Sequence, residues 1–334
     1  MKPVTVLGFG SAIVDVSTVV GETQLRQLGL AKGSMRLATQ EEQQHIIAGL
    51  PGEWERHGGG SVANTLVGLS LLGVQSALYT AVGEDDDGSL FAQDLSELGV
   101  EVVLSEQQYA QGTGRCVVLV TEDGQRTMLT YLGASQELTA ELFPFKVATG
   151  TPYLFIEGYL LDVPGLGDRL FEVARTARRY GTKVIFSLSD ASLVERHRKS
   201  LQRLLPASID YLLANGEEAS AFSQRSDLDQ IVEVLSGMRF SGAITLGDHG
   251  AVYFGSDAYE YLEVPDYALA VDTTGAGDMF AAGFIAGLVH ELRPLDVLRL
   301  GQSLAAEVIA HPGARPLVGL GDWLSEHEPD LANT

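Results

Sequence analysis

Residues 272–278 read Asp-Thr-Thr-Gly-Ala-Gly-Asp, and the apolar run Met279 to Val289 follows directly. Glycines and small residues before an apolar run predict a tight turn that opens a helix. The first N–H groups of a helix have no partner within it and point outward with the positive end of its dipole. We therefore expect an anion-binding turn built from the backbone amides of Gly275, Ala276 and Gly277.

The acid that ends this stretch, Asp278, falls in the first turn of the predicted helix, beside the expected anion site. A carboxylate there can accept the proton of an alcohol that attacks phosphorus, and such a base typically contributes ~10²–10⁴-fold. The alternative is that Asp278 only stabilises the start of the helix, by ~0.3–1 kcal/mol. The stretch suits phosphoryl transfer, because charge collects on the transferring oxygens.

A second glycine cluster, residues 57–65 (His-Gly-Gly-Gly-Ser-Val-Ala-Asn-Thr), precedes another predicted helix. Its glycines would let a ligand approach the backbone closely. The amide of Asn64, one turn into the helix, could pair with two adjacent hydroxyls. The alternative is a tight turn capped by Ser61. Asp15, after the first strand, is a carboxylate in an apolar setting that sugar hydroxyls could satisfy.

Two further motifs fit a nucleotide site, although each could equally be turn or capping chemistry. Asn215 and Glu218 lie on one side of a helix start, and their oxygens suit Mg²⁺, usually through water. Residues 245–250 (Thr-Leu-Gly-Asp-His-Gly) follow the next strand. The pair Gly8 and Gly10 resembles a dinucleotide fingerprint, but Ile13 replaces the third glycine, which argues against a nicotinamide-dependent oxidoreductase.

Short apolar runs alternate with helical patterns along most of the chain, which predicts an α/β protein with a mostly parallel sheet covered on both faces. The strands expected are 4–7, 76–82, 153–156, 184–188, 211–213 and 243–246. The helices expected are 61–72, 90–98, 167–179 and 192–205. Residues 115–121 and 126–131 alternate around Asp123-Gly124, a strong hairpin signal. We expect one domain over residues 1–330, with a small, mostly antiparallel β-sheet lid from excursions near 15–20, 35–39 and 115–131.

The amino-acid composition argues against some classes of binding partner. The 334 residues carry 22 Lys and Arg against 44 Asp and Glu, a net charge of −22, which disfavours nucleic acid and anionic membranes as partners. The single cysteine, Cys116, cannot form an internal disulfide, which fits a reducing, cytoplasmic setting. No uncharged stretch is long enough to span a bilayer.

Taken together, these motifs resemble those of the ribokinase-like (phosphofructokinase-B type) sugar and nucleoside kinases. Residues 58–73 resemble the family's Gly-Gly-x-x-x-Asn signature, and residues 272–283 match its Asp-Thr-x-Gly-Ala-Gly-Asp signature. The resemblance covers about residues 4 to 320. Segments such as Arg126-Thr127-Met128 and Glu157-Gly158-Tyr159-Leu160 look more like adenosine-kinase-like bacterial members.

The resemblance implies a three-layer α/β/α core with a β lid and transfer of phosphate from Mg·ATP to a primary alcohol. It implies that Asp278 is the base and that the amides of residues 275–277 form the anion hole. It also implies that the substrate is contacted by Asp15, Ser11, Gly59 and Asn64. The nucleotide would be contacted by Asn215, Glu218, Thr245, Gly247 and Gly250. Mg²⁺ would bind at Glu218 through water, and K⁺ at Asp272, Thr274 and the loop 311–313. Some relatives pair their lids edge to edge, so a homodimer is an alternative that the resemblance leaves open.

The acceptor stays open between a nucleoside, with adenosine favoured, and a free sugar such as ribose or a ketohexose. Ser11 stands where adenosine kinases usually carry Asn, and a hydroxyl cannot reproduce both faces of an amide. A function of another class, a non-catalytic protein that binds a nucleoside or a sugar, is the remaining alternative.

Overall fold

The computed structural model describes residues 3–104, 109–148, 150–256, 259–317 and 319–332. Within these residues, one large sheet has the order β14-β13-β12-β11-β10-β9-β1-β5-β6. Neighbours are parallel from β12 to β6, whereas β13 and β14 pair antiparallel at one edge. The strands are β1 (Val6–Phe9), β5 (Ser76–Thr80), β6 (Val100–Leu104), β9 (Tyr153–Glu157), β10 (Lys183–Ser187), β11 (Tyr211–Asn215), β12 (Ser241–Thr245), β13 (Ala251–Phe254) and β14 (Tyr259–Leu262).

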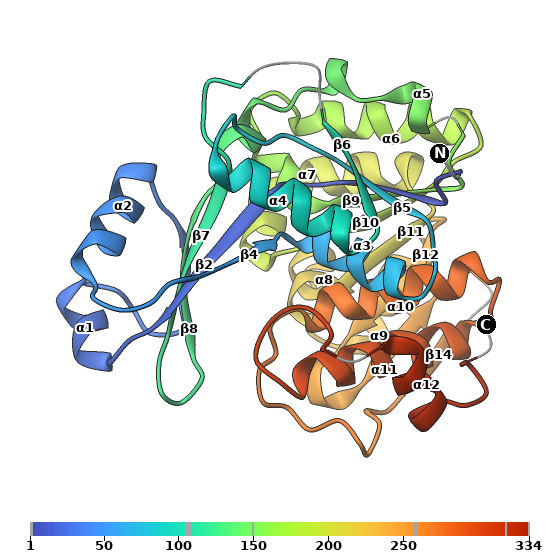
Figure 1. Cartoon of the computed structure of the whole chain (residues 1–334). Coiled ribbons are helices and arrows are strands. Elements are labelled where there is room, and N and C mark those ends of the chain that lie inside the picture. The colour runs from blue at the N-terminus through green and yellow to red at the C-terminus, as the bar shows by residue number, and fades with distance from the viewer. Residues whose placement is uncertain (1–2, 105–108, 149, 257–258, 318, 333–334) are drawn as a thin grey trace.

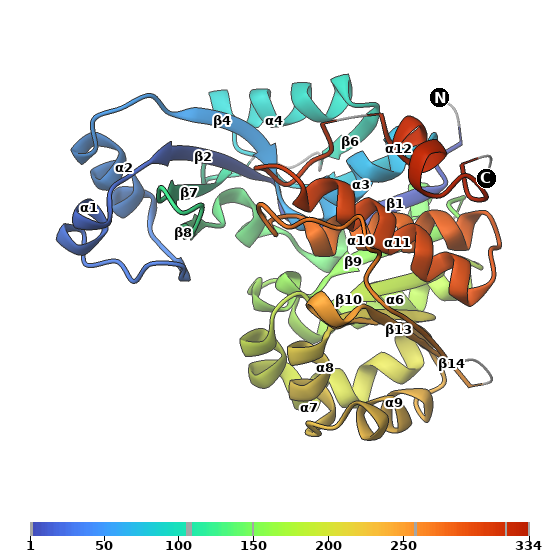
Figure 2. The same cartoon turned by 90° about the horizontal axis from the view of Figure 1, so that it is seen from below.

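Helices cover both faces of this sheet, which Figure 2 shows with α10 and α11 on one side and α7, α8 and α9 on the other. Successive strand residues serve the two faces, so Val6 packs under the first group of helices and Leu7 under the second. The first group is α3 (Ser61–Leu71), α4 (Asp86–Glu97), α10 (Ala276–Val289), α11 (Pro294–Ile309) and α12 (Leu320–His327). The second is α5 (Phe145–Ala148), α6 (Leu170–Arg179), α7 (Ala191–Ser208), α8 (Gly216–Ser223) and α9 (Leu228–Ser236). The predicted three-layer α/β/α core is confirmed.

Short 3₁₀ segments make several of the connections: η1 (Gly133–Glu137), η2 (Ala140–Leu142), η3 (Gly158–Asp162), η4 (Gly167–Arg169) and η5 (Gly247–His249). In the part of the chain that the structure describes, no helix combines the length and apolar character needed to cross a membrane.

A second, small sheet stands beside the core with the order β3-β8-β7-β2-β4 (Figure 1). Its strands are β2 (Ile13–Val19), β3 (Met35–Leu37), β4 (Glu55–Gly59), β7 (Gly114–Val120) and β8 (Arg126–Tyr131). The expected hairpin is present, with Gly124 at φ +79° in the turn between β7 and β8. The expectation of a mostly antiparallel sheet is wrong, because β2 pairs with β7, and β3 with β8, in parallel. Strand β4 was not expected, since Glu55–Gly59 contains no β-branched residue.

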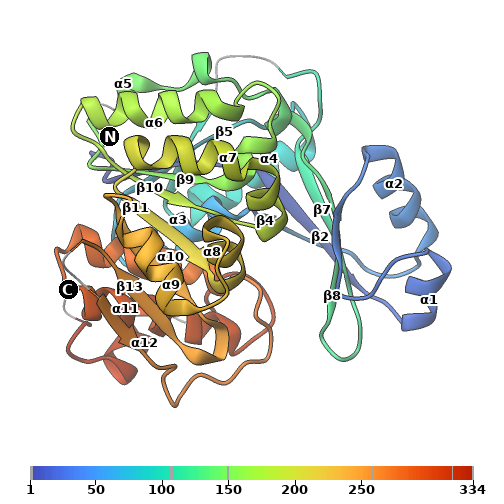
Figure 3. The same ribbon diagram turned by 180° about the vertical axis from the view of Figure 1, so that it is seen from behind.

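The small sheet has two different faces. Its outer face carries Val117, Leu119 and Leu129, which pack against α1 (Glu22–Gln27) and α2 (Gln40–Gly49). Its inner face, away from these helices and toward the core, carries Asp15, Cys116 and Thr130 in register across β2, β7 and β8. Figure 3 shows the sheet between the two helices and the core.

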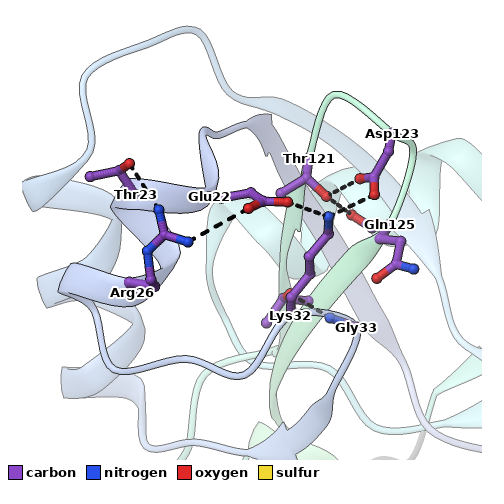
Figure 4. A network of polar contacts seen from close by, with 9 residues as sticks. Glu22, Thr23, Arg26, Lys32, Gly33, Thr121, Asp123 and Gln125 are labelled. Atoms are coloured by element: carbon purple, nitrogen blue, oxygen red, sulfur yellow. Dashed lines mark hydrogen bonds and ion pairs between the residues drawn. The ribbon is translucent and has the colours of Figure 1, made fainter.

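A polar network fixes the far end of the small sheet (Figure 4). The Lys32 ammonium donates to Glu22 Oε1 at 2.7 Å and to Asp123 Oδ2 at 2.6 Å. Thr121 Oγ1 also donates to Asp123, at 2.7 Å. Lysine and threonine together hold the pKa of Asp123 below its usual range. Lys32 therefore joins α1 to the tip of the β7–β8 hairpin.

Candidate active site

The predicted site residues gather where the parallel strands of the large sheet have their carboxyl ends. Glu157, Asn215 and Thr245 end β9, β11 and β12, so all three lie where parallel strands present their carboxyl ends. The small sheet joins the core at the same edge, because β2 follows β1 after the short link of residues 10–12.

Asp278 lies in the first turn of α10, and its side chain contacts α3. Its Oδ1 accepts a hydrogen bond from Ser61 Oγ at 2.7 Å, and its Oδ2 accepts one from Asn64 Nδ2 at 3.0 Å. Burial raises the pKa of Asp278 to about 6, against the opposing effect of these two donors and of Arg315. Helix α3 has Gly60, at φ +98°, as its N-terminal cap, so the alternative that Ser61 is the cap is wrong. Ser61 instead supports the candidate base.

This geometry gives a pH prediction. A base must be ionised, so kcat/KM should fall as the pH drops through about 6. Because the Ser61 hydroxyl bonds to the ionised form, Ser61→Ala should raise the pKa of Asp278 and move the acid limb to higher pH. A pH profile of kcat/KM measures the shift. Ser70→Ala, on the same helix, is the control and should leave the limb in place; an unmoved limb in Ser61→Ala would contradict the assignment.

The turn before α10 has amides available for an anion. Gly275 caps the helix at φ +79°. Within the described residues, no carbonyl accepts from the amides of Gly275, Gly277 or Asp278, whereas Ala276 N donates to Thr273 O at 3.2 Å. The predicted set 275–277 therefore includes one amide that is already engaged, and the Asp278 amide is a further free donor. A Cβ on Gly277 would meet nothing within 4 Å, so this part of the turn is open.

A cavity of about 330 Å³ extends from this turn. Thr245, Gly247 and Gly250, predicted as nucleotide contacts, line it together with Ala276 and Gly277. The remaining wall is mainly apolar and includes Val264, Pro265, Phe280 and Ile309. An anion-binding turn beside an apolar wall matches what a nucleoside triphosphate presents, which is a charged end and a flat, largely apolar ring.

Asp15 lies on the inner face of the small sheet, close to β4. A Cβ on Gly59 would lie 2.5 Å from Asp15 Oδ2, so only glycine leaves this carboxylate in place. Burial raises the pKa of Asp15 to about 6, although Arg315 and Arg126 oppose the shift. The third predicted contact, Ser11, donates its backbone N–H to Glu157 Oε1 at 2.7 Å.

Two arginines in the site were not predicted. Arg315 Nε donates to Asn64 Oδ1 at 3.1 Å, so the Asn64 amide bridges Arg315 and Asp278. Arg126, on the lid hairpin, forms an ion pair with Asp272 in the segment before α10. Arg126 belongs to the segment Arg126-Thr127-Met128 and Arg315 follows the loop 311–313, but only tertiary structure brings these two arginines to the acids.

A family model described as pfkB family carbohydrate kinase matches residues 29–318. The chain belongs to the pfkB family of carbohydrate kinases. It is similar to the adenosine kinase of Sinorhizobium meliloti, with a TM-score of 0.88 and 32% identity over 97% of this chain and 99% of that one.

Two other proteins are similar to this pfkB-family chain. A probable sugar kinase from Rhizobium etli CFN 42 has a TM-score of 0.89 and 31% identity, over 98% of this chain and 99% of that one. An ATP-dependent ribose-1-phosphate kinase from Halopiger xanaduensis is 28% identical, over 77% of this chain and 82% of its own. The chain is thus an ATP-dependent sugar or nucleoside kinase with the ribokinase-like fold.

Kinases of the pfkB family generally use ATP with Mg²⁺. Glu218, in the first turn of α8, is the residue predicted to hold such an ion through water. Its carboxylate accepts from Asn215 N at 3.0 Å and from Asn215 Nδ2 at 2.8 Å, and burial raises its pKa to about 7. Asn215 and Glu218 form a reciprocal capping box at the start of α8, so the capping alternative is confirmed, and Mg²⁺ at Glu218 stays a prediction.

The expected K⁺ ligands have other partners in this pfkB kinase. Asp272 Oδ1 accepts from Thr274 N at 3.0 Å and Thr274 Oγ1 at 2.7 Å. Its Oδ2 accepts from Gly313 N at 2.9 Å and pairs with Arg126. Among residues that the structure describes, no three His, Cys, Asp or Glu side chains gather as a metal site. Asp272 therefore joins the β7–β8 hairpin, the turn before α10 and the loop 311–313, and K⁺ at Asp272 and Thr274 stays a prediction.

Proposed function

We propose that this kinase phosphorylates the primary hydroxyl of a nucleoside, adenosine or a close relative, with Asp278 as the general base. The observation that carries the chemistry is the position of Asp278. Its carboxylate is held by Ser61 and Asn64, and it lies in the first turn of α10, next to Gly277, whose free amide belongs to a residue that lines the cavity. Base and anion site are therefore adjacent and come from one element.

In the proposed transfer, each bond that forms is matched by a bond that breaks. Asp278 takes the proton of the acceptor hydroxyl as its oxygen forms a bond to the γ-phosphorus, and the bond to the β–γ bridging oxygen breaks to release ADP. The amides of Gly277 and Asp278 donate to the phosphoryl oxygens, where negative charge accumulates. Glu218 would hold Mg²⁺ through water, and the ion would neutralise part of the phosphate charge. Asp15 accepts hydrogen bonds from the hydroxyls of the sugar ring and fixes its orientation.

The inner face of the small sheet favours a nucleoside over a free sugar. Ile13, Cys116 and Val118 form an apolar cluster there, with Met128 packed against it, on the face that carries Asp15. These three side chains are already buried, whereas Val120, Met128 and Leu132 beside them are half-buried. An attached base would cover this half-buried apolar surface, which a ribose bound at Asp15 leaves uncovered. The similarity to an adenosine kinase at 32% identity supports the same choice.

ADP release measured over adenosine, guanosine, inosine, ribose and fructose tests the proposal. We expect kcat/KM for adenosine to exceed that for ribose and fructose by at least about 10-fold, since covering the half-buried apolar side chains beside the cluster is worth ~1.4 kcal/mol or more. A preference for ribose or fructose would establish the free-sugar alternative, to which Ser11 points. Thermal stabilisation by a ligand without any turnover would establish the binding protein.

A variant of the inner face adds a second prediction. Val118→Thr keeps the side-chain shape but places a hydroxyl in the apolar cluster, so KM for the nucleoside should rise about 5-fold or more. KM for ATP should not change. Val19→Thr is the matched control, because Val19 shares this face but is 72% exposed and four residues from Asp15. Equal effects of both substitutions on nucleoside KM would contradict the assignment.

A further inference from the structure

A basic cavity lies outside the active site. Its volume is about 460 Å³, and it is lined by Arg175, Arg178, Arg179 and Lys183 together with a single acid, Asp210. The surrounding sequence is unusual for this chain, because residues 169–203 hold nine of the 22 Lys and Arg residues and only three acids. A local positive site in a protein of net charge −22 is therefore a specific feature of the α6–β10 region.

The cavity lies at the amino ends of the strands, whereas the candidate catalytic residues lie at their carboxyl ends. Lys183 begins β10 and Asp210 directly precedes β11, whereas Asn215 ends β11 at the carboxyl edge. Five residues of extended strand separate the two edges by about 16 Å. A ligand in this cavity therefore cannot reach Asp278, and the site is distinct from the nucleotide cavity.

The one acid of the cavity is already neutralised. Arg178 donates to both Asp210 oxygens, from Nε and from Nη2 at 3.1 Å each, and Lys183 Nζ lies 3.6 Å from Oδ1. Arg178 also donates to Ala207 O at 3.0 Å, and Asp210 accepts from Val184 N at 2.9 Å. These bonds hold the floor of the cavity in one arrangement before any ligand arrives.

The remaining cations are available. Arg175 and Arg179 are one turn apart on α6, so they share a face of that helix. In the described part of the chain neither forms an ion pair with a carboxylate. Other arginines on the neighbouring surface do, since Arg169 pairs with Glu141 and Arg203 with Asp168. Free guanidinium groups recognise phosphate oxygens in pairs, which suits a ligand with more than one phosphate.

We propose that this cavity is a second, non-catalytic site for a small molecule carrying a pyrophosphate group, either inorganic pyrophosphate or a nucleotide. Arg175 and Arg179 bind the phosphate oxygens, and Arg178 and Lys183 complete the positive wall around them. The site does not depend on which alcohol the enzyme phosphorylates.

Calorimetric titration of the full chain with sodium pyrophosphate tests this. The wild type should show two sites, one at the turn before α10 and one in the basic cavity. Arg175→Gln/Arg179→Gln should weaken one of them at least about 10-fold, at unchanged kcat. The control Arg26→Gln/Arg225→Gln removes the same charge from exposed positions elsewhere and should keep both sites. Lys183→Gln, made separately and checked for an unchanged Tm, should weaken the same site.

Titration with ADP separates the two sources of the pyrophosphate group. Binding of pyrophosphate alone at the Arg175–Arg179 site assigns the inorganic ion, and tighter binding of ADP assigns a nucleotide. Two results overturn the proposal: identical pyrophosphate titrations of the wild type and the double variant, or equal weakening in the double variant and its control. The second would show that only the overall charge matters.

Discussion

Asp278→Asn is expected to lower kcat by about 10²–10⁴-fold, the usual contribution of a positioned base. KM for ATP should hardly change, because the backbone amides before α10 remain. The amide is neutral and nearly the same shape, and burial already disfavours the charged carboxylate, as its raised pKa shows. The variant should therefore be as stable at pH 7 as the wild type, or more so. Steady-state kinetics and thermal unfolding check both statements.

The control for this prediction addresses the alternative that Asp278 only stabilises a helix start. Asp322 occupies the first turn of α12 and is exposed. Asp322→Asn should cost at most about 1 kcal/mol of stability and leave kcat unchanged. If Asp278→Asn behaves in the same way, with near-normal turnover, Asp278 is not the base.

Gly275→Ala should have the second largest effect, a fall in kcat/KM for ATP of about 10²-fold or more from displacement of the anion-binding turn. Gly275 has φ +79°, which costs an alanine about 1–2 kcal/mol. Its new Cβ would also lie 2.5 Å from Ala314 O and 2.7 Å from Ala314 Cα. Relief of this contact must move the turn away from the loop 311–316. ATP titration of initial rates and thermal unfolding measure the two consequences.

Gly73 provides a matched control. It has the same φ of +79°, but a Cβ there would meet nothing within 4 Å. Gly73→Ala should be less stable than the wild type by about 1–2 kcal/mol, the conformational cost of a positive φ, and should keep its activity. A Gly275→Ala variant that binds and turns over ATP like Gly73→Ala would show that the turn does not hold the phosphates.

The sequence predicted the parallel core well because its signals are local. Residues 153–156 and 184–188 are apolar runs without alternation, and both lie in buried central strands. The Asp123-Gly124 hairpin and the helix that starts at Ser61 depend on a few neighbouring residues, and both are present. Asp278 could be predicted as the candidate base because the turn, the helix start and the carboxylate fall within seven positions.

The remaining features depend on contacts between distant segments. The parallel pairing of β2 with β7 has no local signal, since its partners are far apart in the chain. Strand β4 forms from Glu-Arg-His-Gly-Gly because β2 offers it an edge, not because these residues favour extended structure. Likewise Arg315 reaches Asn64 across 251 positions. Such residues acquire their roles only through tertiary packing.

The pairing of β2 with β7 also has a consequence for synthesis on the ribosome. Ile13 is translated early, but its parallel partner Gly114 emerges only after α3, β5, α4 and β6 have been made. Until then β2 has an unpaired edge, which is a template for association with other chains. The small sheet therefore completes its pairing late, and during this interval the nascent chain carries an open strand edge that can associate with other chains.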